Sequence, residues 1–406
     1  MDCDVAIVGG GMVGASLALA LADSGLSILL VEGTAPDSSM QPSFDDRTTA
    51  LGNASRRIFQ ALGVWPAIAP QAAAITTIHV SDAGRFGFAR LRAQEQGIEA
   101  FGFVVSNRVI GAALWGKLAD QHSLTLRVPA TTEAVQITTD GVRITVATGR
   151  EREEFTARLV VAADGAHSSV RAAAGIDADV EDYDQVAIAA NVAADRAQDG
   201  TAYERFTRSG PLAVLPLYDG SYGVVWTARP DAAAALLALS DAEFLRELQG
   251  RFGWRAGRFV RVGRRASYPL KLSRATSTVA TRTVLIGNAA QALHPVAGQG
   301  FNLGLRDAAI LAELIANAEG DVGSPTLLEQ FSQWRAVDRS GVVRFTDGLV
   351  KLFGDARPGI GTLRNLGLLL FDLTPPAKSA LARVSTGFGG RTPRLARGLA
   401  ARESLS

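Results

Sequence analysis

The chain has 406 residues, of which 47% are hydrophobic, and its 41 basic and 40 acidic residues nearly balance. This length allows two or three domains with ample core, and the near-neutral charge gives no basic face for binding nucleic acid. The only cysteine is Cys3, which excludes an internal disulfide, and the four histidines lack the spacing of metal ligands. We therefore expect a protein of the reducing cytoplasm without a metal site.

The first patterned segment begins at Asp4. An apolar run over residues 4–8 precedes the glycine-rich turn 9–14, GGGMVG, and a small-residue helix expected over 15–22. This is the G-x-G-x-x-G pattern in the strand-turn-helix context that holds the pyrophosphate of a dinucleotide, whereas an isolated glycine turn is the alternative. A second apolar run, 28–31, ends at Glu32, at the spacing at which a carboxylate accepts hydrogen bonds from an adenosine ribose. The predicted dinucleotide contacts in this region are Gly9, Gly11, Met12, Val13, Gly14 and Glu32.

The sequence patterns predict two domains whose segments are interleaved along the chain. Residues 1–75, 104–180 and 276–345 are predicted to build a discontinuous nucleotide-binding domain. Residues 76–103 and 181–275 have alternating strand patterns and turn signals, which favour an antiparallel sheet. Residues 346–406 are expected to form a C-terminal helical region and a basic tail.

Two later segments also join a buried strand to a polar or glycine-rich turn. The apolar run 159–163 leads into DGAHSSVR at 164–171, and the apolar run 284–286 leads into GNAAQALHPVAGQGFNLG at 287–304. The second of these opens a helix expected over 303–315. Such a turn aims backbone N–H groups and the positive end of the helix dipole at one place, where an electron-rich group is expected to bind.

Together the three segments resemble the FAD-dependent aromatic hydroxylases of the para-hydroxybenzoate hydroxylase type, from Asp4 to about Phe345. The resemblance implies an α/β fold, in which a Rossmann-like FAD-binding domain, similar to that of glutathione reductase, is interleaved with an antiparallel-sheet substrate domain and followed by C-terminal helices. It also implies that the first segment holds the ADP half of FAD, the second closes against the pyrophosphate, and the third holds the ribityl chain and flavin ring. The FAD is expected to be non-covalent, because no His or Cys stands in an evident linkage context.

The resemblance carries further site residues with it. No catalytic residue is assigned, and His294, Pro295 and Val296 are the candidates beside the flavin ring. Leu215 and Pro216 are expected near the substrate, although any core strand would look similar. Arg47 could meet the pyrophosphate or a visiting nicotinamide cofactor, or form a surface salt bridge instead. The cofactor contacts implied beyond the first segment are Arg47, Arg108, Asp164, Gly165, Asn288, Pro295, Gly298, Gln299, Gly300, Phe301 and Asn302.

The late segment departs from the usual G-D-A-A-H of this family, since it reads Gly287-Asn288-Ala289-Ala290-Gln291. An asparagine can still hydrogen-bond a ribityl hydroxyl. The residue sequence of this segment resembles the ubiquinone-biosynthesis branch of the family, most closely its hydroxylases of 2-polyprenyl-6-methoxyphenol. The segment DDRTTAL at 45–51 resembles that branch too. Ser106 differs, because the branch more often has Glu there.

This branch implies that O₂ hydroxylates the ring of a lipophilic, polyprenylated phenol through a flavin C4a-hydroperoxide. NAD(P)H or another donor would visit transiently, because the chain has no second G-x-G-x-x-G. Three alternatives stay open: another ring position or phenol, a different FAD enzyme on the same scaffold, and a non-catalytic FAD-containing scaffold of a quinone-biosynthesis assembly.

The C-terminal region supports two hypotheses. Its apolar run at 366–371 is far shorter than the roughly 20 residues that span a bilayer. From Lys378 onward, five arginines face one acidic residue, Glu403. The region could contact an anionic membrane surface, which would place the protein peripherally at the inner membrane, or pack on the FAD-binding domain and leave a solvated tail. The five arginines are Arg383, Arg391, Arg394, Arg397 and Arg402.

Overall fold

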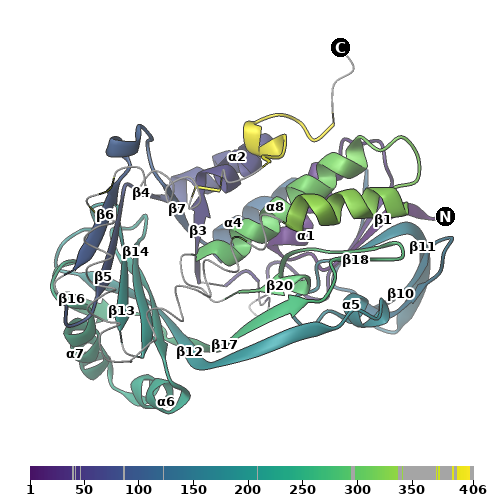
Figure 1. The fold of residues 1–406 in the computed structure, drawn as a ribbon. Helices are drawn as coiled ribbons and strands as arrows, with labels where there is room; N and C mark the ends of the chain where they lie inside the picture. The colour runs from purple at the N-terminus through teal and green to yellow at the C-terminus, as the bar shows by residue number, and fades with distance from the viewer. Residues whose placement is uncertain are drawn as a thin grey trace.

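The computed structural model describes residues 1–336 except 39–40, 42, 46, 86, 122, 208 and 294–297, and further on residues 341, 372, 374, 386–387 and 391–402. The candidates His294, Pro295 and Val296 and most of the expected C-terminal helices lie outside these residues. The described chain forms an eight-stranded sheet, a nine-stranded sheet and a small three-stranded sheet. The two large sheets lie at opposite ends of the molecule, joined by the long strands β12 (Ala178–Ala194) and β17 (Ala266–Ala275) (Figure 1).

The eight-stranded sheet has a parallel centre in the order β19-β11-β1-β2-β8. Strands β1 and β2 are the apolar runs that flank the glycine turn, and nearly every residue in them is buried, as expected for parallel strands covered on both faces. The hairpin β9–β10 and the edge strand β18 extend this sheet antiparallel. The strands are β1 Cys3–Val8, β2 Ile28–Val31, β8 Leu124–Arg127, β9 Thr131–Ile137, β10 Val142–Thr148, β11 Glu151–Ala162, β18 Val279–Ala280 and β19 Thr283–Leu285.

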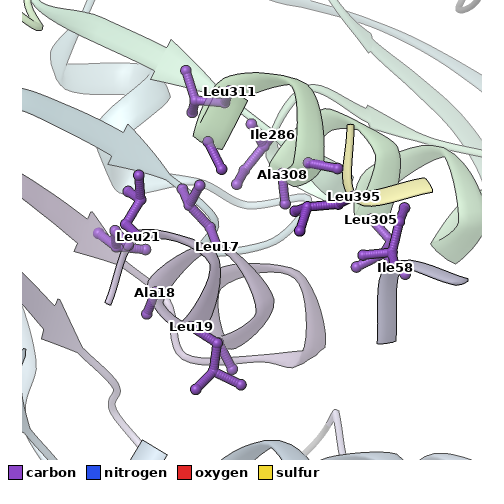
Figure 2. Close-up of a cluster of buried hydrophobic side chains, with 14 of the residues drawn as sticks. Leu17, Ala18, Leu19, Leu21, Ile58, Ile286, Leu305, Ala308, Leu311 and Leu395 are labelled. Atoms are coloured by element: carbon purple, nitrogen blue, oxygen red, sulfur yellow. The ribbon is translucent and has the colours of Figure 1, made fainter. Parts of the chain in front are cut away.

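Helices α1 and α8 pack against each other over this sheet. Figure 2 shows their apolar side chains meeting, with Leu17 from α1, Leu305 and Leu311 from α8, and Ile286 from the end of β19. Helix α2 and the short helix η5 close the same cluster. The helices and 3-10 turns of this part are α1 Met12–Leu21, α2 Asn53–Ala61, α3 Trp65–Ile68, η1 Ala69–Gln71, α4 Asn107–Ala119, α5 Ser169–Ala173, η3 Gly287–Ala289, α8 Gln299–Ala316, the helical residues 325–336, and η5 Leu395–Arg397.

The nine-stranded sheet has the order β20-β17-β12-β15-β14-β13-β5-β6, and β16 also pairs with β12. Its pairs are antiparallel except that β13 lies parallel to β5, where the segment before residue 103 joins the later one. Helices α6 and α7 cover its outer face, around Trp226 and Phe244. The elements are β5 Thr77–Asp82, β6 Phe88–Arg92, η2 Gln94–Gln96, β13 Thr201–Thr207, β14 Gly210–Pro216, β15 Tyr222–Ala228, α6 Pro230–Ala238, α7 Asp241–Phe252, β16 Phe259–Val262 and β20 Gln291–Ala292.

The small sheet lies between the two large ones and has the order β3-β7-β4. Its strands are β3 (Thr48–Gly52), β7 (Gly102–Ser106) and β4 (Ala73–Ile75). Ser106 ends β7 and caps helix α4, since its hydroxyl accepts a hydrogen bond from the N–H of Val109. The position at which the branch more often has Glu therefore serves here as a helix cap.

Residues 391–402 are the described part of the expected basic tail, and they pack on the helices of the first sheet. Leu395 and Ala396 are buried in the core that α2 and α8 share. The N–H of Arg394 donates to Glu313 at 2.6 Å, and the Arg391 guanidinium lies 3.7 Å from the ring centre of Trp334. Burial of two apolar side chains holds this segment on the protein, while the side chains of Arg391, Arg397 and Arg402 stay exposed. Within the described residues, no helix is long and apolar enough to cross a membrane.

Candidate active site

The first glycine turn is built so that helix α1 can approach strand β1 closely. Gly9 has φ +102°, in the left-handed region, and a Cβ there would lie 2.5 Å from the carbonyl of Ala163. A Cβ on Gly14 would overlap the carbonyl oxygen of Gly9. Gly11 is the N-cap of α1, so the first-turn N–H groups of that helix point out of the sheet at this turn.

Glu32, at the end of β2, faces the same turn. Its carboxylate accepts hydrogen bonds from the N–H of Gly10 at 2.6 Å and from the N–H of Thr34 at 2.9 Å. The indole of Trp115 donates to the carbonyl of Gly10 at 3.1 Å and supports the turn from α4. Glu32 is thus fixed beside the fingerprint, and its contact with a ribose stays a prediction.

The middle segment lies against this turn. The Oδ2 of Asp164 accepts hydrogen bonds from the N–H and hydroxyl of Ser169, whereas its Oδ1 is buried and has no partner among the described residues. Gly165 has φ +85°, which requires a glycine at this point. Arg171 joins the segment to the late loop, because its guanidinium donates to the carbonyls of Ala166 and Ala289 at 2.9 and 3.0 Å.

The late loop, residues 287–304, begins beside Val13 of helix α1. Gly287 and Gly304 both lie against the Val13 side chain, and Asn288 is exposed between buried neighbours. Helix α8 starts at Gln299, four residues before the start expected from the apolar pattern at 303. The apolar pattern misses the first turn because Phe301 is the single apolar side chain beside Gln299, Gly300 and Asn302.

The first turn of α8 is open on one side. Its N-cap, Gly298, has φ +60°, and a Cβ there would lie 3.1 Å from the Cβ of Ala50 in β3. A Cβ on Gly300 would have nothing within 4 Å. No residue that the structure describes fills the space on this side of the helix end, and the partial positive charge of the helix favours a negatively charged group there.

A buried polar network supports the late loop from behind. The Oδ2 of Asp307 accepts hydrogen bonds from the N–H of Gly287 at 3.1 Å and from the Nε2 of Gln291 at 3.3 Å. Its Oδ1 pairs with the guanidinium of Arg335 at 2.6 Å, and both side chains are almost fully buried. Asp307 and Arg335 support the site although no local sequence pattern predicts a role for them there. The departure at Gln291 was the one available signal, because this side chain is part of the network.

One face of the nine-stranded sheet is covered by α6 and α7, and the opposite face, here called the inner face, lies toward β3. A Cβ on Gly223 would lie 3.1 Å from the hydroxyl oxygen of Thr48, and Arg47 lies 5.4 Å from the ring centre of Tyr268 on β17. Strand β3 thus contacts the late loop at Ala50 and the sheet at Thr48. The inner face of the sheet and the first turn of α8 therefore border the same region of the molecule.

One row of side chains crosses this inner face. Every residue in the row keeps part of its accessible surface, whereas the residues next to them along each strand, which point outward, are buried except for Arg205. Most of these side chains are small and apolar, so they leave room above the sheet. The paired positions of the row, from β5 to β12, are Val80, Glu204, Ala213, Val225 and Ala189.

Leu215 and Pro216 do not share a face, contrary to the expectation that both lie near the substrate. Leu215 is on the inner face, paired with Gly223, and packs, as Ala50 does, against the buried cluster around Val104. Pro216 is the next residue along β14 and points to the outer face, where it is buried. Adjacent residues of a strand point to opposite faces, so only Leu215 is placed to meet a ligand on the inner side.

A family model described as an FAD binding domain matches residues 2–346. The chain belongs to this family. Its relatives include ubiquinone hydroxylase UbiL of Rhodospirillum rubrum, which is 38% identical over 98% of this chain and 93% of that protein. The 3-demethoxyubiquinol 3-hydroxylase of Escherichia coli is 33% identical over 90% of this chain and 94% of its own length.

Solved structures agree on the fold. The p-nitrophenol 4-monooxygenase PnpA of Pseudomonas putida superposes with a TM-score of 0.79 at 21% identity, covering 96% of this chain and 98% of that one. The chain is thus an FAD-dependent monooxygenase of mixed α/β architecture, as the sequence predicted.

The described residues fit FAD. The buried, unpartnered Oδ1 of Asp164 is an acceptor that a cofactor hydroxyl could satisfy. Within the part of the chain that the structure describes, no side chain fills the space beside Gly300, where the resemblance places the flavin ring. Exposed Asn288 presents its amide at the position predicted for the ribityl chain. The individual cofactor contacts remain predictions.

One predicted contact, Asn302, can offer FAD only its backbone, and a second, Phe301, packs part of its ring on the core. The side chain of Asn302 is buried, accepts from Gly52 and Ser55, and donates to Ala50 and Gly298. The ring of Phe301 lies 6.0 Å from that of Phe59 in the core. The Asn302 side chain therefore fastens β3 to α8 rather than reaching the cofactor. Its sequence context gave no means of separating these two roles.

The predicted contacts Arg47 and Arg108 lie together at the start of α4. Arg47 pairs with the carboxylate of Asp45 at 2.5 Å, and the N–H of Arg108 donates to the Asp45 carbonyl at 3.0 Å. Burial raises the pKa of Tyr268, while the adjacent Arg47 guanidinium opposes that effect. The salt-bridge alternative for Arg47 is thus realised with Asp45, and its contact with pyrophosphate or nicotinamide stays a prediction.

Proposed function

We propose that this monooxygenase hydroxylates the aromatic ring of a polyprenylated phenol in ubiquinone biosynthesis, with 2-polyprenyl-6-methoxyphenol as the expected substrate. The observation that carries the proposal is the accessible, mostly apolar row on the inner sheet face, which borders the region of the late loop. Such a surface suits a lipophilic ring and tail. The names of the relatives from Rhodospirillum rubrum and Escherichia coli support the choice of pathway.

Bound FAD, once reduced, would supply the activation of O₂ that no side chain can provide. The chain contributes binding, charge and exclusion of water. The first turn of α8 offers its positive end to an electron-rich ring, an effect worth roughly 0.3 to 2 kcal/mol. The apolar inner face keeps water from the reacting ring, which limits unproductive loss of reducing equivalents.

We also propose an electron donor and a membrane or protein partner for this enzyme. NAD(P)H is the proposed visiting electron donor, because the chain has one G-x-G-x-x-G, which we assign to the ADP half of FAD. Contact with the inner membrane or with a quinone-biosynthesis complex is proposed from the substrate, since a polyprenyl chain partitions into lipid.

A deletion strain tests the function directly. We expect aerobic cells without this protein to accumulate 2-polyprenyl-6-methoxyphenol and to lose ubiquinone, as measured by mass spectrometry of lipid extracts. Growth of the complemented strain under ¹⁸O₂ should label the new ring hydroxyl, whereas H₂¹⁸O should not. An unchanged quinone pool, or label arriving from water, would contradict the assignment.

A second ring position is a specific alternative. The Escherichia coli relative is named for hydroxylation of 3-demethoxyubiquinol, and it is 33% identical to this chain. The same lipid profile separates the two candidates, because a strain blocked at that step accumulates the demethoxy quinol instead of the methoxyphenol.

Gly298→Val is expected to abolish hydroxylation while the protein stays yellow. Valine at φ +60° is strained, and its Cβ would press on Ala50, so the first turn of α8 must move. Most predicted FAD contacts lie elsewhere, and turnover should fall at least about 10²-fold, as expected for misplaced reacting groups. The absorption spectrum measures bound flavin, and oxygen uptake measures turnover.

Gly398→Ala is the matched control. Gly398 has φ +81° with nothing within 4 Å of a Cβ, and it lies in the C-terminal segment away from the late loop. It shares the backbone strain and should leave turnover unchanged. Full activity in the Gly298→Val protein would mean that the late loop is not beside the reactive ring.

A further inference from the structure

Glu204 is a carboxylic acid whose immediate neighbours on the inner face of the sheet are apolar. It lies in β13 opposite Ala213 of β14 and Val80 of β5, and Ala202 and Phe206 flank it on the same face. It forms no hydrogen bond or ion pair with any residue that the structure describes. Its side chain nevertheless keeps part of its accessible surface, as does the whole row to which it belongs.

An acid in this position is costly for folding and therefore calls for a functional explanation. Burial raises the pKa of Glu204 from 4.5 to about 7, because the charged form loses hydration without gaining a partner. A leucine or valine would suit an apolar sheet face better. A carboxyl group with a pKa near the working pH is suited to taking up and returning a proton.

Two of the charged groups near the inner face of the sheet form ion pairs with other residues. On β5, Asp82 occupies an inner-face position and pairs with Arg85 at 3.7 Å. From the FAD-binding side, Arg47 pairs with Asp45. Tyr268, on the inner face of β17, adds a phenol whose pKa is raised by burial. Burial alone accounts for the pKa of Glu204, so these groups do not neutralise it.

We propose that Glu204 is a catalytic residue that binds the hydroxyl group of the phenol substrate and accepts its proton. This inference rests on the proposed function. The phenol O–H bond breaks, the proton passes to a carboxylate oxygen of Glu204, and the electron pair stays on the phenolate oxygen. The ring thereby becomes more electron-rich and a better nucleophile toward activated oxygen. After hydroxylation the proton returns to the phenol oxygen, so Glu204 is regenerated and no further reactant is consumed.

The small side chains beside Glu204 fit this role. Ala213, Val225 and Ala189 continue the row away from it and leave an apolar, accessible strip next to the carboxyl group. A phenol whose hydroxyl meets Glu204 could lay its ring on this strip. The sequence contained the signal for this residue, since Glu204 interrupts the apolar inner positions Ala202 and Phe206, but that alternation does not reveal which face meets the substrate.

Glu204→Gln tests the proton transfer. Glutamine keeps the shape of the side chain but cannot accept the proton, so we expect kcat/KM to fall about 10²-fold. In the unmodified enzyme kcat/KM should rise with pH through about 7, as Glu204 ionises. The kcat/KM of the variant should not show this rise. Glu247→Gln is the control, because Glu247 is an exposed acid on α7, which covers the opposite face of the sheet.

Glu204→Leu separates catalysis from folding. Leucine suits the apolar face, so this variant should bind FAD normally and melt at the same or a higher temperature while losing hydroxylation. Its stability advantage should grow from pH 4.5 to about 7, because over this range the unfolded acid is ionised and the folded acid is not. A lower melting temperature together with the lost activity would indicate a structural role and overturn the proposal.

A prenylated methoxyphenol gives a readout that does not need turnover, because its phenolate absorbs at longer ultraviolet wavelengths than the phenol and hardly forms in free solution near pH 7. Difference spectra should show that the unmodified holoenzyme binds it as phenolate above about pH 7, with Glu204→Gln binding the neutral phenol at the same pH. Equal phenolate signals and equal pH profiles in the two proteins would overturn the role of Glu204. An unmodified enzyme that shows the phenolate signal but hydroxylates no polyprenylated phenol would contradict the proposed substrate instead, and would leave the proton transfer supported.

Discussion

Gly14→Ala is expected to give a protein that no longer retains FAD. A single methyl group at this position would overlap the carbonyl oxygen of Gly9 and lie 3.1 Å from the Cβ of Ala163. Helix α1 would have to move away from β1, carrying its first-turn N–H groups away from the pyrophosphate position. Overpacking of this kind typically costs 1–3 kcal/mol, so we expect a colourless protein with a lower melting temperature. The flavin absorbance per protein and a thermal unfolding curve measure the two effects.

Gly116→Ala is the matched control for this change. Gly116 is an exposed residue inside helix α4, and a Cβ there would have nothing within 4 Å. Alanine in a helix interior should stabilise the protein by roughly 0.5 to 1 kcal/mol and leave FAD binding intact. Normal flavin content in Gly14→Ala would remove the basis for assigning the first glycine turn to the cofactor.

Asp307→Asn is expected to destabilise the protein by about 3 to 5 kcal/mol, the cost typical of leaving one partner of a buried ion pair uncompensated. Asparagine can still accept hydrogen bonds from Gly287 and Gln291, so the change isolates the charge that faces Arg335. Movement of the late loop should also weaken FAD binding. Denaturant unfolding and flavin titration measure the two effects.

Arg152→Met removes a surface cation as a control. Arg152 pairs with Glu133, but its side chain is 67% exposed, and exposed pairs contribute about 0 to 1 kcal/mol. The double change Asp307→Leu with Arg335→Met should recover part of the stability that Asp307→Asn loses, because no isolated charge remains buried. If Asp307→Asn were as mild as Arg152→Met, the network would not support the late loop in the way its geometry indicates.

The FAD-binding fold was readable from the sequence because its signals are local. Strands β1 and β2, the turn at Gly9 and helix α1 follow one another within about thirty residues, and each depends on side-chain size or polarity at a fixed spacing. The runs before Asp164 and before Gly287 became β11 and β19 for the same reason. Helix boundaries were read less well, as at Gln299, since glycine-rich first turns carry no apolar pattern.

The side-chain roles at the site depend on contacts between distant segments. Asn302 meets Gly52 and Ser55, Asp307 meets Arg335, and β5 enters the nine-stranded sheet beside β13, more than one hundred residues away. The sequence around each of these residues does not predict which distant residue it will contact. A polar residue that fastens two strands looks the same in sequence as one that reaches a ligand.

The sequence by itself determined that this chain holds a dinucleotide on a strand-turn-helix unit, because only glycine permits the close approaches at Gly9 and Gly14. The tertiary structure alone decided which face of the second sheet meets the FAD-binding domain. That choice places Leu215 inward and Pro216 outward, and it leaves Glu204 on an accessible, apolar face. The physical reason is that a strand pattern fixes two faces, whereas the packing of one domain on another decides which of them becomes the site.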